Sequence, residues 1–247
     1  MFNHSQQIVS HAAQNNVPAV YPWRSVVATQ DGLLSYGPDL VDIVRRSAPY
    51  VGRPSRNVTG FTMSSPAIAG KRLALLRELV PSLHKVGYLW VPASPMMMQF
   101  GKEVRTAAEQ LGIELVSLPL KSGPDFSIVF AIAEKEGVEA VLVEADLLTV
   151  RYSGTITDEC VLRNLPAMHA WPFEVQLGAL IAYGPPATED FRGAADYVDR
   201  ILQGAKIADL PFQEPTEIRL GINLRTARSI GLNVPATLLA RADEVIE

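Results

Sequence analysis

Short apolar runs alternate with amphipathic stretches from about residue 82 to the end of the chain. The apolar runs are rich in Val, Leu and Ile, and residues typical of turns or helix starts follow each of them. This alternation is typical of a parallel sheet whose strands are connected by helices, so it predicts an α/β fold in which helices flank a parallel sheet. The predicted strands cover residues 86–91, 113–118, 140–143, 165–169 and 179–183.

Cap residues and glycines mark where the connecting helices begin and end. Ser94 followed by Pro95 is typical of a helix N-terminus, and Gly112 is a stop signal for the helix that starts there. The same reasoning predicts helices over residues 68–80, 125–136, 156–163 and 188–202. In the C-terminal tail, the pattern predicts a strand over residues 217–222 and a last helix over residues 236–246.

The chain contains an internal repeat. Val17–Trp23 matches Leu165–Trp171 at an offset of 148 residues, and Leu34–Pro38 matches Ile181–Pro185 at an offset of 147. The second register continues as far as Arg53, which matches Arg200. Two copies separated by unrelated sequence are not a solenoid array. We therefore predict that residues 1–53 duplicate residues 156–200 as a strand–loop–strand–helix unit.

The composition excludes several classes of protein. The chain has 247 residues, a net charge of −4 and no block of basic residues, so nucleic acid and anionic membranes are not expected partners. The uncharged stretch over residues 86–101 contains prolines and is shorter than the roughly 20 apolar residues that a membrane-spanning helix needs. The first residues have neither the basic start nor the apolar run of a signal peptide.

Signatures of catalysis and of metal binding are missing from the sequence. It contains no phosphate-binding glycine loop, no zinc-protease motif and no nucleophile elbow. The four histidines show no metal-ligand spacing with Cys160, the only cysteine. We therefore expect no metal, no cofactor and no catalytic residue, and we keep a small α/β enzyme with an unrecognised site only as a minor alternative.

Several segments carry a family resemblance, among them Tyr183-Gly184-Pro185 and Leu210-Pro211-Phe212. The others are residues 53–61, 71–81, 194–206, 222–227 and 238–246. These segments resemble the ABC-transporter substrate-binding proteins of the tryptophan/tyrosine-importer-like group, and they follow one another along the chain in the same order as in that group. The resemblance implies a type I periplasmic-binding-protein fold, in which two α/β lobes close on a small solute and deliver it to an ABC permease. It also implies a non-enzymatic protein that is periplasmic or membrane-attached, although without a signal peptide this chain would be cytoplasmic if it is the full product.

The N-terminal region departs from the family pattern, because the duplicate occupies the place of the first strands. We therefore expect one complete ligand-binding lobe, residues 82–183 with 212–247, and a shortened N-terminal lobe, residues 1–81 with 184–204. The alternative hypothesis is a truncated or fused paralogue that binds no solute. Such a chain would leave a sheet edge open, and exchange of N-terminal segments in a homodimer would cover it.

Ligands of parallel sheets bind at the carboxyl ends of the strands, and several polar or aromatic residues follow the predicted strands. If the solute is an aromatic or branched amino acid, as the resemblance implies, Ser94 would bind its carboxylate and Asp146 its ammonium group. Trp171, with Tyr183 and Gly184, would contact its side chain. Structural roles as a helix cap, a turn carboxylate, a packing residue and a hinge are the alternatives.

A second loop precedes the predicted helix that starts near residue 68. It contains Phe61, Thr62, Ser64 and Ser65, and we expect it to close over the solute from the other lobe. A loop with an ordinary helix cap is the alternative. The expected partners are therefore a small-molecule solute and a permease.

Overall fold

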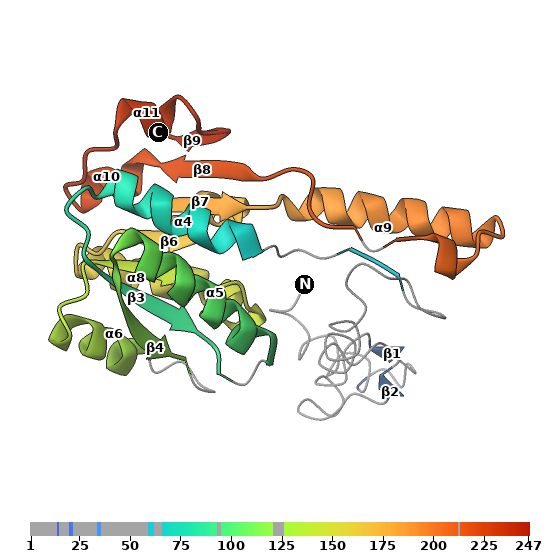
Figure 1. The fold of residues 1–247 in the computed structure, drawn as a ribbon, viewed down its shortest axis with the longest axis horizontal. Coiled ribbons are helices and arrows are strands. Elements are labelled where there is room, and N and C mark those ends of the chain that lie inside the picture. Colours follow the sequence, from blue (N-terminus) through green and yellow to red (C-terminus); the bar gives the residue numbers. More distant parts are fainter. Residues whose placement is uncertain are drawn as a thin grey trace. The chain divides into compact units, whose positions relative to one another are not determined.

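The computed structural model describes residues 59–61, 66–92, 95–120, 126–211 and 213–247, together with Gln14, Val20–Tyr21 and Leu34–Ser35. The chain divides into two compact units, Met1–Val51 and Gly52–Glu247. The larger unit contains a seven-stranded sheet and its helices (Figure 1).

The sheet of the larger unit has the strand order β4-β3-β5-β6-β7-β8-β9. All neighbouring strands are parallel except β7 and β8, which are antiparallel. The predicted α/β class with a mostly parallel sheet is therefore confirmed. The strands are β3 (Lys85–Trp90), β4 (Glu114–Pro119), β5 (Ala140–Val143), β6 (Ala167–His169), β7 (Ile181–Gly184), β8 (Arg219–Asn223) and β9 (Glu244–Ile246).

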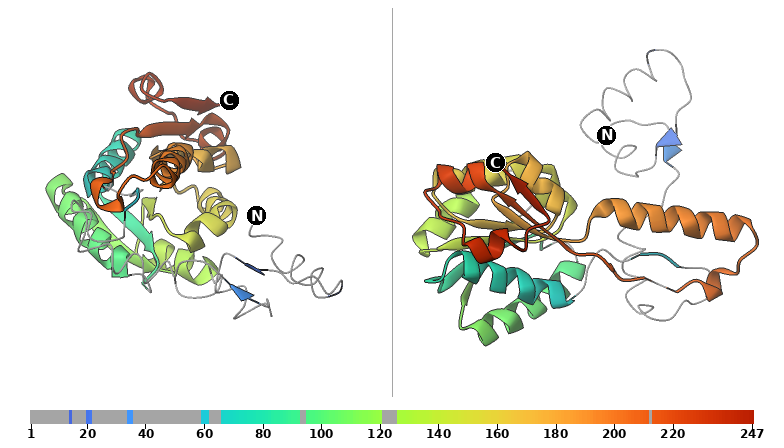
Figure 2. Two further views of the ribbon diagram at one scale, coloured as in Figure 1. Left: turned by 90° about the vertical axis from the view of Figure 1, so that its right-hand side faces the viewer. Right: turned by 90° about the horizontal axis from the view of Figure 1, so that it is seen from above.

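Helices cover both faces of this sheet (Figures 1 and 2). Two of them, α4 (Pro66–Leu79) and α5 (Pro95–Leu111), contribute to one hydrophobic core. On the opposite face, α6 (Phe126–Lys135) and α8 (Ser153–Leu162) contribute to a second core. The remaining elements are α7 (Leu147–Arg151), η3 (Pro172–Leu177), α9 (Ala187–Leu202), η4 (Ile207–Asp209), α10 (Leu224–Ser229) and α11 (Ala236–Leu239).

Strand β5 shows why the apolar runs lack a polar face. Ala140 and Leu142 belong to the core beneath α4, whereas Val141 and Val143 belong to the core beneath α6. Successive side chains of a strand point to opposite faces, so a strand that is covered on both faces is apolar throughout.

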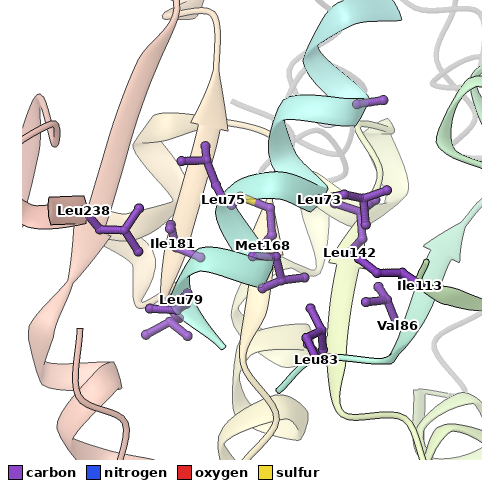
Figure 3. Close-up of a cluster of buried hydrophobic side chains, with 14 of the residues drawn as sticks. Leu73, Leu75, Leu79, Leu83, Val86, Ile113, Leu142, Met168, Ile181 and Leu238 are labelled. Atoms are coloured by element: carbon purple, nitrogen blue, oxygen red, sulfur yellow. The ribbon is translucent and has the colours of Figure 1, made fainter. Parts of the chain in front are cut away.

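Helix α4 lies against the centre of the sheet (Figure 3). Leu73 and Leu76 are completely buried in the same core as Leu142 and Met168. Burial of each leucine side chain contributes about 1.5–3 kcal/mol, so α4 is a structural part of this lobe. The sequence-based lobe boundary at residue 81 assigned α4 to the N-terminal lobe, whereas in the structure α4 packs against the sheet.

The C-terminal tail corrects one prediction. A single helix was expected over residues 236–246, but α11 ends at Leu239 and residues 244–246 form β9. Asp243 explains the change, because its carboxylate accepts a hydrogen bond from the Leu220 N–H at 2.7 Å and its own N–H donates to the Leu220 carbonyl at 2.8 Å. These bonds join the tail to β8 across the sequence, which a local helical pattern cannot predict.

The smaller unit contains a short parallel pair, β1 (Val20–Tyr21) and β2 (Leu34–Ser35). Val20 pairs with Leu34 there, and the residues at the repeat-equivalent positions, Met168 and Ile181, pair in β6 and β7. The two copies of the repeat therefore share one strand pairing and one register. The helix predicted for the first copy lies outside the described residues.

Candidate functional site at the carboxyl edge of the sheet

The carboxyl ends of β5, β6 and β7 lie side by side and hold three of the predicted ligand-contacting residues. Asp146 follows β5, Trp171 follows β6 and Tyr183 lies in β7. Neighbouring strands are about 4.8 Å apart, so the ends of the three strands fall within roughly 10 Å of one another along the edge. We refer to this end of the sheet as the carboxyl edge.

Asp146 is the N-cap of α7. Its carboxylate accepts a hydrogen bond from the Leu148 N–H at 2.8 Å, and the Thr149 hydroxyl accepts one from the Asp146 N–H at 3.0 Å. This capping box fixes the direction in which the carboxylate leaves β5. A carboxylate has about four acceptor positions, so one capping bond leaves capacity for an ammonium group.

Trp171 is the half-buried residue that precedes η3. Its backbone N–H donates to Glu174 Oε2 at 3.0 Å. The indole Nε1 is buried and has no hydrogen-bond partner among the described residues. A buried indole N–H usually has a hydrogen-bond partner, so this N–H is free to donate to a ligand or a water molecule.

Tyr183 and Gly184 end β7, where the chain leaves the sheet towards α9. The Tyr183 carbonyl accepts a hydrogen bond from Arg72 Nε at 2.7 Å. A methyl group added at Gly184 would lie 2.0 Å from the Ala170 carbonyl oxygen, so only glycine fits this close approach of two strands. Glycine at this position therefore has a packing role whatever its relation to the solute.

The residues predicted for the other side of the site are only partly described. Ser94, Thr62, Ser64 and Ser65 lie outside the described residues. Phe61 packs its ring against Tyr197 of α9, with 4.8 Å between ring centroids, and forms an isolated parallel bridge with Gln213.

A buried arginine that sequence analysis did not single out connects the strand ends. Arg72 of α4 is 6% exposed; its Nη2 donates to the Ala170 carbonyl at 3.1 Å, and its Nη1 lies 3.5 Å from Glu144 Oε1. A signal for it exists, because Arg72 occupies the apolar stripe of α4 with Leu76 and Leu79 at helical spacing. A charged residue in such a stripe indicates a buried partner.

Glu144 is the acidic partner of Arg72. It continues the alternation of β5 towards α4 and accepts a hydrogen bond from the Tyr88 hydroxyl at 3.0 Å. Burial, followed by the charge of Glu144, raises the pKa of Tyr88, so the phenol stays a donor. Burial lowers the pKa of Arg72, while the carboxylates of Glu144 and Glu174 raise it, and an arginine remains protonated at neutral pH. Burial and the charge of Glu144 also raise the pKa of Glu103 on α5.

A second buried pair supports the segment that carries Trp171. His169 Nδ1 lies 3.1 Å from Glu174 Oε1, and both side chains are buried. Burial raises the pKa of Glu174, but His169 and the hydrogen bonds to the carboxylate lower it by more, so its net pKa lies below the ordinary value. Glu174 thus joins β6 to η3 as an acceptor for both His169 and Trp171.

The described residues contain no group of three or more His, Cys, Asp or Glu side chains that could hold a metal ion. Burial raises the pKa of the Cys160 thiol, which makes it a poor nucleophile. None of the helices in the described part of the chain is long and apolar enough to cross a membrane.

Comparison with known proteins identifies the class to which this fold and edge belong. The family model of the ABC transporter substrate-binding proteins matches residues 7–246, and the chain belongs to this family. The family consists of solute-binding proteins, not enzymes, that work with a permease. Because the match starts at residue 7, it includes most of the duplicated N-terminal segment, and the truncated-paralogue alternative is not favoured.

Solved structures show the same fold at low sequence identity. A conserved domain protein from Vibrio cholerae is 23% identical, with a TM-score of 0.75 over 98% of this chain and 82% of that chain. The ABC domain in complex with L-Trp from Streptococcus pneumoniae is 19% identical, with a TM-score of 0.73 over 99% and 86%. A ligand-free, open substrate-binding protein with adhesive properties from Clostridium difficile is 18% identical, with a TM-score of 0.62 over 99% and 83%. A search of the curated proteins finds no match.

Proposed function

We propose that this chain is the solute-binding component of an ABC importer and that it holds a small organic solute at the carboxyl edge of its sheet. The observation that carries the proposal is the placement of Asp146, Trp171 and Tyr183 at the ends of three adjacent strands. A carboxylate and aromatic side chains at one edge suit a solute that has both an ammonium group and an apolar part.

An aromatic amino acid is the first solute to test. The indole of Trp171 offers an apolar face and an N–H that has no hydrogen-bond partner in the described part of the chain, and Asp146 offers a carboxylate after the neighbouring strand. A protein of the same fold is described in complex with L-Trp, which makes L-tryptophan the first probe. The chain leaves β7 at Gly184 and continues into α9, so this crossing is the hinge about which we propose that closure occurs.

Calorimetric titration and thermal shift test the proposal directly. L-tryptophan, L-tyrosine, L-phenylalanine and the branched amino acids form the panel. A solute present at 100 times its Kd stabilises the folded state by about 2.7 kcal/mol, which raises Tm measurably. The proposal is overturned for amino acids if no member of the panel raises Tm or releases heat on binding.

Two substitutions at one position separate ligand contact from helix capping. Asparagine caps helices as well as aspartate, so Asp146→Asn keeps the capping bond and removes the charge. We expect Asp146→Asn to retain the stability of the native protein and to weaken binding of L-tryptophan about tenfold or more, as the loss of a charged hydrogen bond does. Asp146→Ala is the matched control, and it also loses the roughly 1 kcal/mol of the cap. If Asp146→Asn binds as well as the native protein, Asp146 is only a cap.

Delivery to a permease follows from the family, and it carries a further part of the proposal: location at the periplasmic face of the membrane or attachment to it. Cell fractionation with an antibody to the chain checks this location. Recovery only in the cytosol would contradict it.

A further inference from the structure

The three strand ends of the proposed site share one buried side chain, and this inference rests on the proposed function. Arg72 reaches the Ala170 carbonyl, directly before Trp171, and the Tyr183 carbonyl, directly before the crossing at Gly184. Its third contact is Glu144, the residue that directly follows β5, two positions before Asp146. We infer that Arg72 is the positioning residue of the solute site, which fixes Trp171 and the crossing relative to each other.

The geometry of the guanidinium supports this role. Its Nε and Nη2 atoms donate to carbonyls at the ends of two neighbouring strands, at 2.7 Å to Tyr183 in β7 and at 3.1 Å to Ala170, which follows β6. A guanidinium presents its donors in a fixed planar fork, so two carbonyls bound by one fork keep a constant separation. An ammonium group carries its three donors on one rotating nitrogen at the end of a flexible stem, so it does not fix the separation of two carbonyls in this way.

Gly184 gives an independent indication that the Ala170 carbonyl and the Arg72 guanidinium are tightly packed against β7. A Cβ atom at this position would lie 2.0 Å from the Ala170 carbonyl oxygen and 3.2 Å from Arg72 Nη2. The carbonyl that Arg72 binds is therefore also held from the β7 side. A shift of this carbonyl would move Trp171, the next residue in the chain.

The test measures the position of Trp171 without a solute and then the affinity with one. The chain has three tryptophans, so 5-fluorotryptophan labelling gives three fluorine resonances, and Trp171→Phe assigns the one of interest. The variants are Arg72→Met, Arg72→Lys and Gly184→Ala. Arg77→Met is the matched control, because Arg77 lies on the same helix, is exposed and binds only the Leu111 carbonyl among the contacts described.

We expect Arg72→Met and Arg72→Lys to shift the Trp171 resonance and to weaken L-tryptophan binding about tenfold or more, since each loses a charged hydrogen bond to the strand ends. Arg72→Lys keeps a positive charge beside Glu144 and should unfold at a higher temperature than Arg72→Met, yet it should not recover the affinity. A purely structural role predicts the opposite, with affinity restored along with stability. Arg77→Met should change neither readout.

If Arg72→Met does not fold, Arg72→Lys and Gly184→Ala supply the same comparison, because both displace the Ala170 carbonyl and keep a cation beside Glu144. Folded variants with a native Trp171 resonance overturn the inference, and so does a shifted resonance with native affinity for L-tryptophan. If the native protein does not bind L-tryptophan, the proposed function fails for that solute. The fluorine resonance then decides the positioning role by itself.

Discussion

The two edges of the sheet differ in how far their interacting charged groups are exposed to water. At the amino edge, where β3, β4 and β5 begin, the carboxylate of Glu139 accepts hydrogen bonds from the N–H groups of His84 at 2.6 Å and Lys85 at 3.0 Å. Lys85 Nζ also lies 3.0 Å from Glu114 Oε1. Glu139, His84 and Glu114 are exposed, so water shares in every one of these interactions.

At the carboxyl edge, three of the charged groups are buried. Arg72, Glu144 and Glu174 have side chains that are at most 8% exposed, and Glu174 lies beside the buried His169. Exposed ion pairs contribute about 0–1 kcal/mol, whereas a buried pair gains little over apolar packing but is costly to break. In the described part of the chain, the buried Arg and Glu side chains all lie at the carboxyl edge. We infer that they serve the geometry of the site at that edge.

The largest expected effect separates the two edges directly. Glu144→Ala leaves the Arg72 guanidinium buried without its carboxylate, so we expect the free energy of unfolding to fall by about 3–5 kcal/mol. Glu114→Ala, at the amino edge, is the matched control and should change it by less than about 1 kcal/mol. Urea unfolding at pH 7 measures both. Equal effects of the two substitutions would contradict the comparison.

A double substitution sharpens this result. Arg72→Met combined with Glu144→Leu removes both charges, so no buried charge is left without its opposite charge, and the double variant should be more stable than Glu144→Ala alone. A double variant that loses the full sum of the single effects would show that the two side chains act independently.

Glu174 gives the next effect, and it depends on pH. Its net pKa in the folded protein lies below the ordinary value of 4.5. A carboxylate with a lowered pKa stabilises the fold above pH 4.5, and this contribution is lost as the pH falls through the folded-state pKa. Glu174→Gln should therefore reduce the free energy of unfolding by about 1–3 kcal/mol at pH 7.

Urea unfolding of the native protein and of Glu174→Gln at a series of pH values checks this sign. The difference between the two should be constant from pH 7 to about 5 and should shrink below pH 4.5. A difference that stays the same at pH 3 would show that the carboxylate charge does not contribute.

The elements that local chemistry determines were predictable from the sequence. Strand β5 was predicted with its observed bounds, because an apolar run covered on both faces and a preceding Gly137 are local signals. Gly112 and Gly137 end α5 and α6 with φ values of +65° and +68°, which glycine adopts readily. Strand β9 was not predictable, since it depends on the bonds between Asp243 and Leu220.

The site divides in the same way. The rule that ligands bind at the carboxyl ends of parallel strands was enough to place Asp146 and Trp171 at one edge of the sheet, and their contact with a solute stays a prediction. Arg72 was missed because it lies 111 residues from Tyr183 and 98 from Ala170, whose carbonyls it binds. No pattern along the chain contains such a contact, and only the charged residue within an apolar stripe gave a hint of it.

Glu139 at the amino edge should give the smallest effect. Hydrogen bonds from the N–H groups of His84 and then Lys85 lower the pKa of this exposed carboxyl below its ordinary value of 4.5. Glu139→Gln should reduce the free energy of unfolding by less than about 1 kcal/mol at pH 7, because solvent screens an exposed group. The sign of the pH dependence is the same as for Glu174, so the difference should disappear as the pH falls below 4.5. It should also shrink at high salt, which weakens exposed interactions far more than buried ones. If Glu139→Gln is as harmful as Glu174→Gln, the two edges do not differ in the way that their burial implies.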